Sequence, residues 1–374
     1  MNADERNAGL VERLPEIDDR WRDAFRAVPR HLFIPERAWC VSGAGSRGQV
    51  IDQAADPERW LDAVYSNIPI VTQVDDGAAD IADLANRHHD FTSSSSMPGI
   101  VATELDLLDP YEGDKVLEIG TGTGWTAALL AHRLGPEHVT SVEIDPALHE
   151  AAAENLKRAG HSPRLVLGDG TEGWPEGGPY DHVHVTCGVR RVPHAWIAQT
   201  RPGGTIVLPW MTGWGGHMVR LTVAAGGTAV GRFHHPCGFM LLRSQRGAGG
   251  QVEGDYRDSR TDLDPRRVAR PGRDADLALG GMLPGVNRAF GEVDDGEFRL
   301  WLSSADSEAE VRHMPGDRQA VVRQRGPRDL WDEAEAAFLR WVCLGSPGRD
   351  RFGLTVTAEE QYVWLDLPDR QVTP

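Results

Sequence analysis

The chain of 374 residues carries a formal net charge of −17 at pH 7, and 40% of its residues are hydrophobic. The acidity argues against a nucleic-acid partner, because binding DNA or RNA depends mainly on Lys and Arg side chains that neutralise phosphates. No run of about eighteen apolar residues is present, and the charged N-terminus lacks the apolar stretch of a secretion signal, so we expect a cytoplasmic protein without a membrane partner.

The first predicted element is a helix near the N-terminus, within residues 16–35. Ile17, Trp21, Phe25 and Val28 recur at helical spacing, and Pro29 ends the pattern. From residue 38 to residue 90 the signal is mixed, with one short strand expected in YSNIPIVTQVDDG and irregular polar segments around it.

A regular alternation of helices and strands begins at Pro98. A helix is expected from there to Leu108, and strands then alternate with helices of ten to fifteen residues, which is typical of a parallel α/β sheet. The expected strands cover 115–120, 138–145, 163–169, 180–186 and 204–210. The expected helices cover 125–134, 147–160 and 192–200.

The last part of the chain follows a segment rich in Gly, Asp and Arg that shows no periodicity. We predict a catalytic domain over 1–245 with an insertion at about 38–90, a linker over 246–275, and an accessory α+β domain over 276–374. Strands at 297–304, 319–326 and 353–366 would surround a helix at 329–345 in this domain.

Cysteines and paired histidines give no metal or disulfide signal. Cys40, Cys187, Cys237 and Cys343 are scattered without a CxxC pair, so we expect buried free thiols. The pairs His88–His89 and His234–His235 have no Cys or carboxylate partners at ligand spacing, and we predict no metal site.

The first chemical signal is the sequence EIGTGTG, residues 118–124, between an expected strand and an expected helix. Its glycines allow a tight turn and close approach of a ligand to helix amides. Glu143 ends the next strand, where it can accept hydrogen bonds from ribose hydroxyls, and Asp169 ends the third, where it can accept from an adenine amino group. The expected ligand-binding residues are Glu118, Gly120, Thr121, Gly122, Thr123, Gly124, Glu143, Ile144, Asp169 and Gly170.

The glycine spacing indicates which adenosine ligand is bound. A dinucleotide site favours G-x-G-x-x-G, whereas this chain has G-x-G-x-G preceded by Glu118, whose carboxylate would repel a pyrophosphate. S-adenosylmethionine carries an ammonium and a sulfonium and no phosphate, so we predict it as the cofactor and S-adenosylhomocysteine as the product. The alternative is that Glu118 and Glu143 are only solvated charges at strand ends.

In these motifs the sequence resembles the protein-L-isoaspartate O-methyltransferase family of class I methyltransferases. The matching segments are AVPRHLFIP, SMPGIVATELDLLDPYEGDKVLEIGTGTGWTAALLA and GDGTEGWPEGGPYDHVHVTCGVRRVP, in the family's order, and the match runs from about Asp18 to Arg243. The resemblance implies an α/β fold: a Rossmann-like class I methyltransferase sheet, here with an N-terminal insertion and a small C-terminal α+β domain.

The resemblance also implies a substrate site in the serine run before Pro98. Ser96 matches the family's Ser-x-Pro serine beside the methyl donor and the substrate carboxylate, and Thr186 matches a position next to the bound carboxyl. Ser95 is a further candidate. Helix amides near Pro98 would add to an anion-accepting site. The alternative is that the serines only cap the helix.

Two departures from compact repair enzymes bear on the substrate. About sixty residues separate Pro35 from Ser96, and the portion after about Gly247 has no counterpart in compact repair enzymes. This arrangement resembles methyltransferases that tailor ribosomally made peptides of the lanthipeptide and graspetide type. We therefore expect methylation of an Asp carboxylate in a cyclised peptide, leading to succinimide and isoaspartate.

Other functions stay open. The alternative is a repair enzyme that methylates isoaspartyl residues of damaged proteins, and a third possibility is an S-adenosylmethionine-binding module without catalysis. Either enzyme would have a peptide or protein partner with an Asp or isoAsp carboxylate, and the sequence leaves the oligomeric state open. The C-terminal tryptophans and arginines would form either a peptide-docking surface or a small core with solvated charges. These residues are Trp301, Trp331, Trp341, Trp364, Arg323, Arg325 and Arg328.

Overall fold

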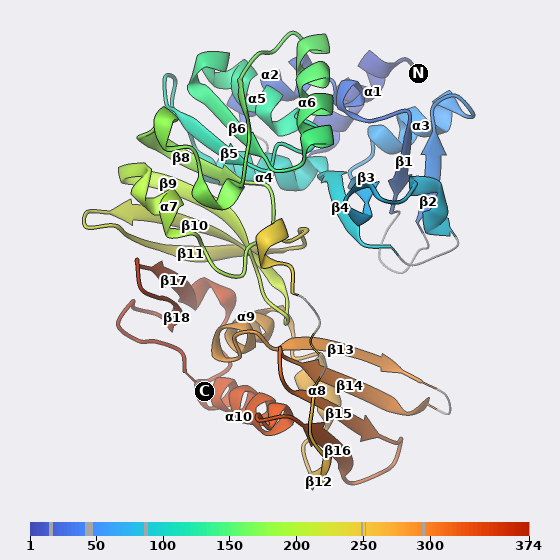
Figure 1. The fold of residues 1–374 in the computed structure, drawn as a ribbon, viewed down its shortest axis with the longest axis vertical. Coiled ribbons are helices and arrows are strands. Elements are labelled where there is room, and N and C mark those ends of the chain that lie inside the picture. The colour runs from blue at the N-terminus through green and yellow to red at the C-terminus, as the bar shows by residue number, and fades with distance from the viewer. Residues whose placement is uncertain are drawn as a thin grey trace. The chain divides into compact units, whose positions relative to one another are not determined.

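The computed structural model describes residues 1–14, 18–41, 48–85, 89–247, 250, 252–293 and 296–373, and it divides into two compact units (Figure 1). The first unit comprises Met1–Cys187, Pro193–Leu208 and Thr222–Ala225. The second comprises Gly188–Val192, Pro209–Leu221 and Gly226–Pro374. Ile17 and His88, both considered above, lie outside the described residues. None of the described helices has the length and apolar character needed to cross a membrane.

The first unit is built on a parallel sheet with strand order β9-β8-β5-β6-β7. This order places the carboxyl ends of β5, β6 and β7 at one edge, as in a doubly wound fold. All residues of β5 and β6 are buried, which suits central strands covered on both faces. The strands are β5 (Val116–Ile119), β6 (Val139–Glu143), β7 (Arg164–Leu167), β8 (Tyr180–Val185) and β9 (Thr200–Met211), the last belonging to this unit up to Leu208.

Helices of the first unit begin and end at the signals that the sequence carries. Asp145 caps α6 by accepting hydrogen bonds from two amides of its first turn, and Pro146 occupies the first helical position. The expected helices at 98–108 and 125–134 are confirmed as α4 and α5. The helices are α1 (Ala3–Arg13), α2 (Asp19–Ala27), α3 (Pro57–Val64), α4 (Pro98–Leu108), α5 (Trp125–Leu134), α6 (Pro146–Arg158) and α7 (His194–Ala198).

The N-terminal insertion contains a four-stranded antiparallel sheet of order β2-β1-β3-β4, where the sequence predicts one short strand in an irregular segment. Its strands have only four or five residues each, which is too short for a clear alternation of apolar and polar residues. Of the serine run, residues 93–96, the first three residues belong to the last strand of this sheet, and Ser96 follows its end. The strands are β1 (Arg37–Cys40), β2 (Gln49–Asp52), β3 (Ile70–Val74) and β4 (Phe91–Ser95).

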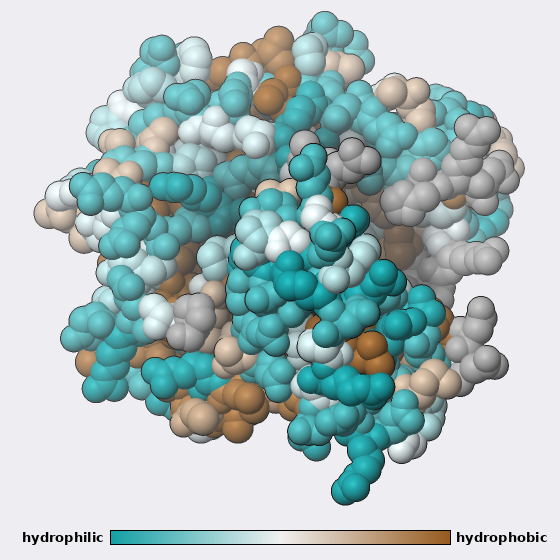
Figure 2. All heavy atoms as spheres, turned by 60° about the horizontal axis from the view of Figure 1, so that its bottom comes forward, coloured by the Kyte–Doolittle hydropathy of each residue, from teal (hydrophilic) through white to brown (hydrophobic). Residues whose placement is uncertain are grey.

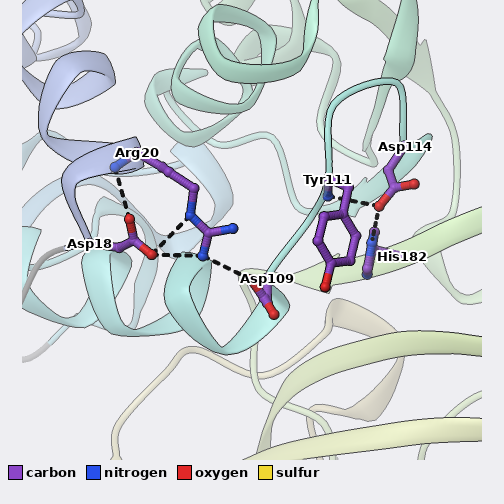
Figure 3. A network of polar contacts seen from close by, with 6 residues as sticks. All are labelled: Asp18, Arg20, Asp109, Tyr111, Asp114 and His182. Carbon is purple, nitrogen blue, oxygen red and sulfur yellow. Dashed lines mark hydrogen bonds and ion pairs between the residues drawn. The ribbon is translucent and has the colours of Figure 1, made fainter.

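Two polar contacts fix the connection from α4 into β5 (Figure 3). Arg20 donates to the carboxylates of Asp18 and Asp109, which ties the end of α4 to the start of α2. His182 Nε2 on β8 lies 2.9 Å from Asp114 Oδ2, directly before β5. These contacts hold the start of the strand whose other end carries the glycine turn.

The second unit contains strands in the order β18-β17-β11-β10 and a separate five-stranded antiparallel sheet of order β12-β16-β15-β14-β13. Helices α8 and α10 pack against the five-stranded sheet. The elements are β10 (Gly216–Ala224), β11 (Thr228–Cys237), β12 (Arg257–Thr261), α8 (Pro265–Ala269), α9 (Arg273–Met282), β13 (Asn287–Glu292), β14 (Phe298–Ser303), β15 (Glu308–His313), β16 (Ala320–Arg325), α10 (Leu330–Cys343), β17 (Phe352–Val356) and β18 (Gln361–Leu365).

Regular elements occupy part of the segment where we predicted a linker. Strand β12 is an edge strand whose side chains are exposed apart from Thr261, and it pairs with β16 through its backbone. Such pairing leaves no apolar pattern in the sequence. Helix α8 is capped by Asp264, which accepts from the Arg266 amide.

The tryptophans of the C-terminal part divide between core and surface. Trp331 and Trp364 are buried, as the core interpretation predicts, whereas Trp301 is 38% exposed. Arg325 pairs with Glu308 at 2.7 Å, so it is not an unpaired surface charge. Figure 2 shows a face on which hydrophilic residues predominate and hydrophobic residues are scattered, in keeping with the acidic composition.

Candidate cofactor and substrate site

The glycine turn lies at the carboxyl end of β5 and has left-handed backbone at Gly120 and Gly122, with φ of 92° and 55°. A Cβ atom on Gly120 would lie 2.7 Å from Thr186 Oγ1. At Gly122 the nearest atom to an added Cβ is Ser93 Oγ at 3.8 Å. The turn is therefore packed against β8 on one side, and it leaves space at Gly122 for a ligand to approach the backbone.

Glu143 is held across this turn from the end of β6. Its Oε2 accepts a hydrogen bond from Gly122 N at 2.9 Å, and its Oε1 accepts from the amides of Ile144 and Asp145, both at 3.0 Å. The carboxylate thus sits beside the turn with a fixed orientation. This places an acceptor where hydroxyl groups of a ribose would meet it, and the residues fit an adenosine ligand.

Asp169 and Gly170 follow β7 at the same edge of the sheet. Asp169 is exposed and uses Oδ1 to accept from the Thr171 amide at 2.9 Å, which leaves Oδ2 for a ligand. Gly170 is buried, and a Cβ atom there would lie 2.7 Å from Ile119 Cγ2. Glycine at this position therefore lets the segment after β7 pack directly on β5.

Glu118, one of the residues that we expect to bind the ligand, is enclosed in the structure. Its side chain is 0% exposed, and Ser141 donates a hydrogen bond of 2.5 Å to its Oε2. His184 lies between Glu118 and Glu104, with N···O distances of 3.9 Å and 3.7 Å. The Glu118 carboxyl therefore lies against Ser141 of β6 and His184 of β8, and a contact with the ligand stays a prediction.

The two carboxyl groups govern the pKa of the buried His184. Burial alone would lower this pKa, but the nearby Glu104 and Glu118 outweigh that effect and raise it to about 9. Burial likewise raises the pKa of Glu104. His184 is thus a buried imidazole with an acidic side chain on either side, and these neighbours favour its protonated form.

The serine run alternates between buried and accessible side chains, as a strand requires. Ser93 and Ser95 are buried, and Ser95 Oγ accepts from Arg30 Nε at 3.2 Å. Ser96 is half-buried, and its hydroxyl makes no hydrogen bond to any described residue. The structure therefore leaves Ser96 as the accessible candidate and places Ser95 in the protein interior.

Helix α4 does not offer the open amides that we expected at its start. Pro98 has no N–H, and the next amide, Gly99 N, donates to Asn67 Oδ1 at 2.8 Å. No serine caps this helix, because its N-cap residue is Met97 and makes no side-chain hydrogen bond. The capping alternative is thus wrong, and the first helix amide is occupied by Asn67, a residue that no sequence motif marks.

Thr186 follows β8, and its hydroxyl is directed at the glycine turn. It donates to the carbonyl oxygens of Gly120 and Ile119, the latter at 3.1 Å. A hydroxyl has one proton to donate, so this proton serves the turn in the structure. Thr186 thus holds the backbone of the glycine turn, and its place beside the substrate carboxyl stays a prediction.

The insertion contributes to the same region through the hairpin of β3 and β4. Gln73 Nε2 donates to Asp145 Oδ2 at 3.3 Å, and Thr92 Oγ1 donates to Gln73 Oε1 at 2.9 Å. This hairpin thereby contacts the segment that follows Glu143. Nothing in the sequence pattern marks Gln73, because its partner is 72 residues away.

In the described part of the chain, no group of three or more His, Cys, Asp or Glu side chains is arranged to hold a metal ion. None of the four cysteines forms a disulfide. Only Cys40 is buried, and Cys343 is exposed, so the prediction of buried thiols is wrong for Cys343.

A family model and individual relatives both match this chain and have the same enzyme name. Residues 59–246 match the family model described as protein-L-isoaspartate(D-aspartate) O-methyltransferase. A protein-L-isoaspartate O-methyltransferase of Methanopyrus kandleri is 37% identical over 253 residues, which cover 64% of this chain and 91% of that protein. One of Methanothrix thermoacetophila is 47% identical over 207 residues, or 54% of this chain and 80% of that protein.

A solved structure of a protein-L-isoaspartate O-methyltransferase shares the fold. It aligns with a TM-score of 0.54 at 22% sequence identity, and the alignment covers 97% of this chain and 100% of that one. The shared fold therefore extends past residue 246 into the second unit.

Proposed function

The chain belongs to the protein-L-isoaspartate O-methyltransferase family of S-adenosylmethionine-dependent carboxyl O-methyltransferases, and on this premise we propose that it methylates isoaspartyl carboxylates of proteins or peptides. This is the repair-type function. The observation that carries it is the ordered edge of the sheet, where Glu143 accepts a hydrogen bond from Gly122 of the glycine turn and the strand that leads to Ser96 approaches the same glycine, with Ser93 Oγ and Ser94 O at 3.8 and 3.9 Å from an added Cβ.

The residues at this edge suit S-adenosylmethionine, which when bound supplies an electrophilic methyl group. Glu143 would hold the ribose hydroxyls, the turn at Gly120 and Gly122 would line the ligand, and Asp169 would accept from the adenine amino group. The supporting observation is that Glu143 is already fixed by backbone amides and that Asp169 keeps one free carboxylate oxygen.

The substrate side needs orientation more than acid–base chemistry. A carboxyl group with a pKa of about 4 is ionised at neutral pH, so no general base is required. Ser96 would donate its hydroxyl proton to the carboxylate and align one oxygen for attack. Thr186 would act on the same site through the carbonyl oxygens of the turn, and Ser95 through the backbone that it shares with Ser96.

The comparisons favour the repair-type alternative over tailoring of a cyclised ribosomal peptide. The relatives above are named for isoaspartate methylation. The C-terminal extension had favoured a dedicated peptide, but the solved structure described above, which carries the same enzyme name, aligns over 97% of this chain. The extension therefore does not separate the two functions.

The test is transfer of labelled methyl groups from S-adenosylmethionine to an isoaspartyl peptide and to its aspartyl twin. We expect transfer to the isoaspartyl peptide only. Transfer to neither, with cofactor binding shown by calorimetry, would contradict the proposal and favour a dedicated substrate, for which cyclised ribosomal peptides would be assayed next. The variant Ser96→Ala should retain cofactor affinity and lose turnover.

A further inference from the structure

Arg30 is a buried arginine in the segment between α2 and β1, and it is 0% exposed. Its guanidinium donates to six oxygen atoms at 2.9–3.4 Å, all but one of them backbone carbonyls. The acceptors are the carbonyl oxygens of Val64, Ser66, Ile68, Ser95 and Ser96 and the hydroxyl oxygen of Ser95.

No carboxylate in the described part of the chain pairs with Arg30. The ring of Trp125 also contacts Arg30, with the guanidinium carbon 5.4 Å from the ring centroid, and Trp125 is the first residue of α5 after the glycine turn. Burial accordingly lowers the pKa of Arg30 to about 9. A buried cation is costly unless its hydrogen bonds are satisfied, and only the planar guanidinium has enough donors to satisfy this set.

The hydrogen bonds of Arg30 converge on the candidate substrate site. Arg30 Nη2 donates to Ser95 O at 3.0 Å and to Ser96 O at 2.9 Å, so it fixes the backbone on both sides of the Ser95–Ser96 peptide bond. The same side chain ties this peptide to the end of α3 through Val64 O at 2.9 Å. The Ser96 hydroxyl is left free while its backbone is held.

We propose that Arg30 is a positioning residue that fixes the Ser96 hydroxyl for the substrate carboxylate. The inference rests on the proposed function and deepens it, because it says how the orienting group is held. Arg30 does not touch the substrate, since its side chain is enclosed. Its contribution passes through the Ser95–Ser96 backbone, and removing it should misalign a carboxylate that still binds.

The experiment is a double-mutant cycle in the full chain, with Arg30→Lys, Ser96→Ala and the double variant. Lys keeps the charge but has three donors, so it leaves carbonyl oxygens unsatisfied. We expect Arg30→Lys to lower kcat/KM for the isoaspartyl peptide about tenfold or more, mainly through a lower kcat. The Kd of S-adenosylmethionine should stay within about threefold of the wild-type value. In the Ser96→Ala background the same change should cost less than about threefold.

The control is Arg6→Lys, which alters another buried arginine of the first unit. Arg6 contacts Glu58 and Asp62 and makes no contact with the serine run. Peptide kinetics should not change in this variant. If Arg30→Lys lowers kcat/KM by the same factor in the wild type and in Ser96→Ala, the proposal is overturned. Equal factors mean that the two substitutions act independently, as they would if Arg30→Lys only destabilised the fold. If Arg30→Lys does not fold, Arg30→Gln retains a planar donor group and replaces it in the cycle.

Hydrogen exchange separates a failure of this inference from a failure of the proposed function. If the wild-type chain methylates neither peptide, or Ser96→Ala is too slow to measure, the exchange of backbone amides over residues 93–100 still reports on Arg30. Faster exchange there in Arg30→Lys than in Arg6→Lys supports the positioning role. Unchanged exchange over that segment overturns it.

Discussion

Replacing Gly120 by alanine tests whether the shape of the glycine turn governs cofactor affinity. The backbone at Gly120 has φ of 92°, which costs an L-residue about 1–3 kcal/mol. The new Cβ would also lie 2.7 Å from Thr186 Oγ1, and moving that hydroxyl forfeits its hydrogen bonds to the turn, worth about 1 kcal/mol. The two effects sum to about 2–4 kcal/mol.

If S-adenosylmethionine binds only to the conformation that the turn has in the structure, the variant must adopt that conformation at this cost in free energy. The Kd of S-adenosylmethionine should then rise about 30- to 1000-fold. Isothermal titration calorimetry with S-adenosylmethionine and S-adenosylhomocysteine measures it directly. Gly113→Ala is the matched control, because Gly113 has φ of 86° and nothing within 4 Å of an added Cβ. A folded Gly120→Ala protein with a Kd within threefold of wild type would refute the reasoning.

Two further predictions concern Glu143 and His184. Glu143→Ala removes the acceptor of three backbone amides and should raise the Kd of S-adenosylmethionine more than about 100-fold, measured by calorimetry. The control is Glu150→Ala, at an exposed position, which should leave the Kd unchanged. Equal Kd values for the two variants would show that Glu143 is not part of the site. His184 has a folded pKa of about 9, above its ordinary 6.5, so its contribution is complete below pH 6.5 and is lost as pH rises to about 9. The free energy of unfolding in urea should therefore fall by roughly 2–3 kcal/mol more between pH 6 and pH 9.5 in wild type than in His184→Gln, and parallel pH profiles would contradict the assignment.

The sequence was most informative where local signals and long-range packing agree. Pro98 and Gly124 set the starts of α4 and α5, and both helices match their predicted bounds. The position of Glu143 beside the glycine turn could be predicted, because the second parallel strand of a doubly wound sheet ends next to that turn. The antiparallel sheet in the insertion could not be predicted, because its short strands pair through their backbones and their sequences show little apolar periodicity.

In the candidate site, too, the surroundings of some residues could not be predicted from the sequence. Glu118 lies two positions before Gly120, and a carboxylate near a strand end is usually solvated, so its burial could not be predicted from its position. It is buried because Ser141 and His184 lie opposite it on the neighbouring strands. Arg30 lies in the segment AVPRHLFIP, which resembles the family's. An arginine in such a segment can be either buried or exposed to solvent, so its burial could not be predicted.

The division of the chain has a consequence for how the second unit was acquired. An extension added by fusing a gene segment to a 3′ end would be continuous in sequence, whereas this unit also uses Gly188–Val192 and Pro209–Leu221, which alternate with residues of the first unit. A single crossover near residue 246 would therefore leave Gly188–Val192 and Pro209–Leu221 of this unit behind in the other parent.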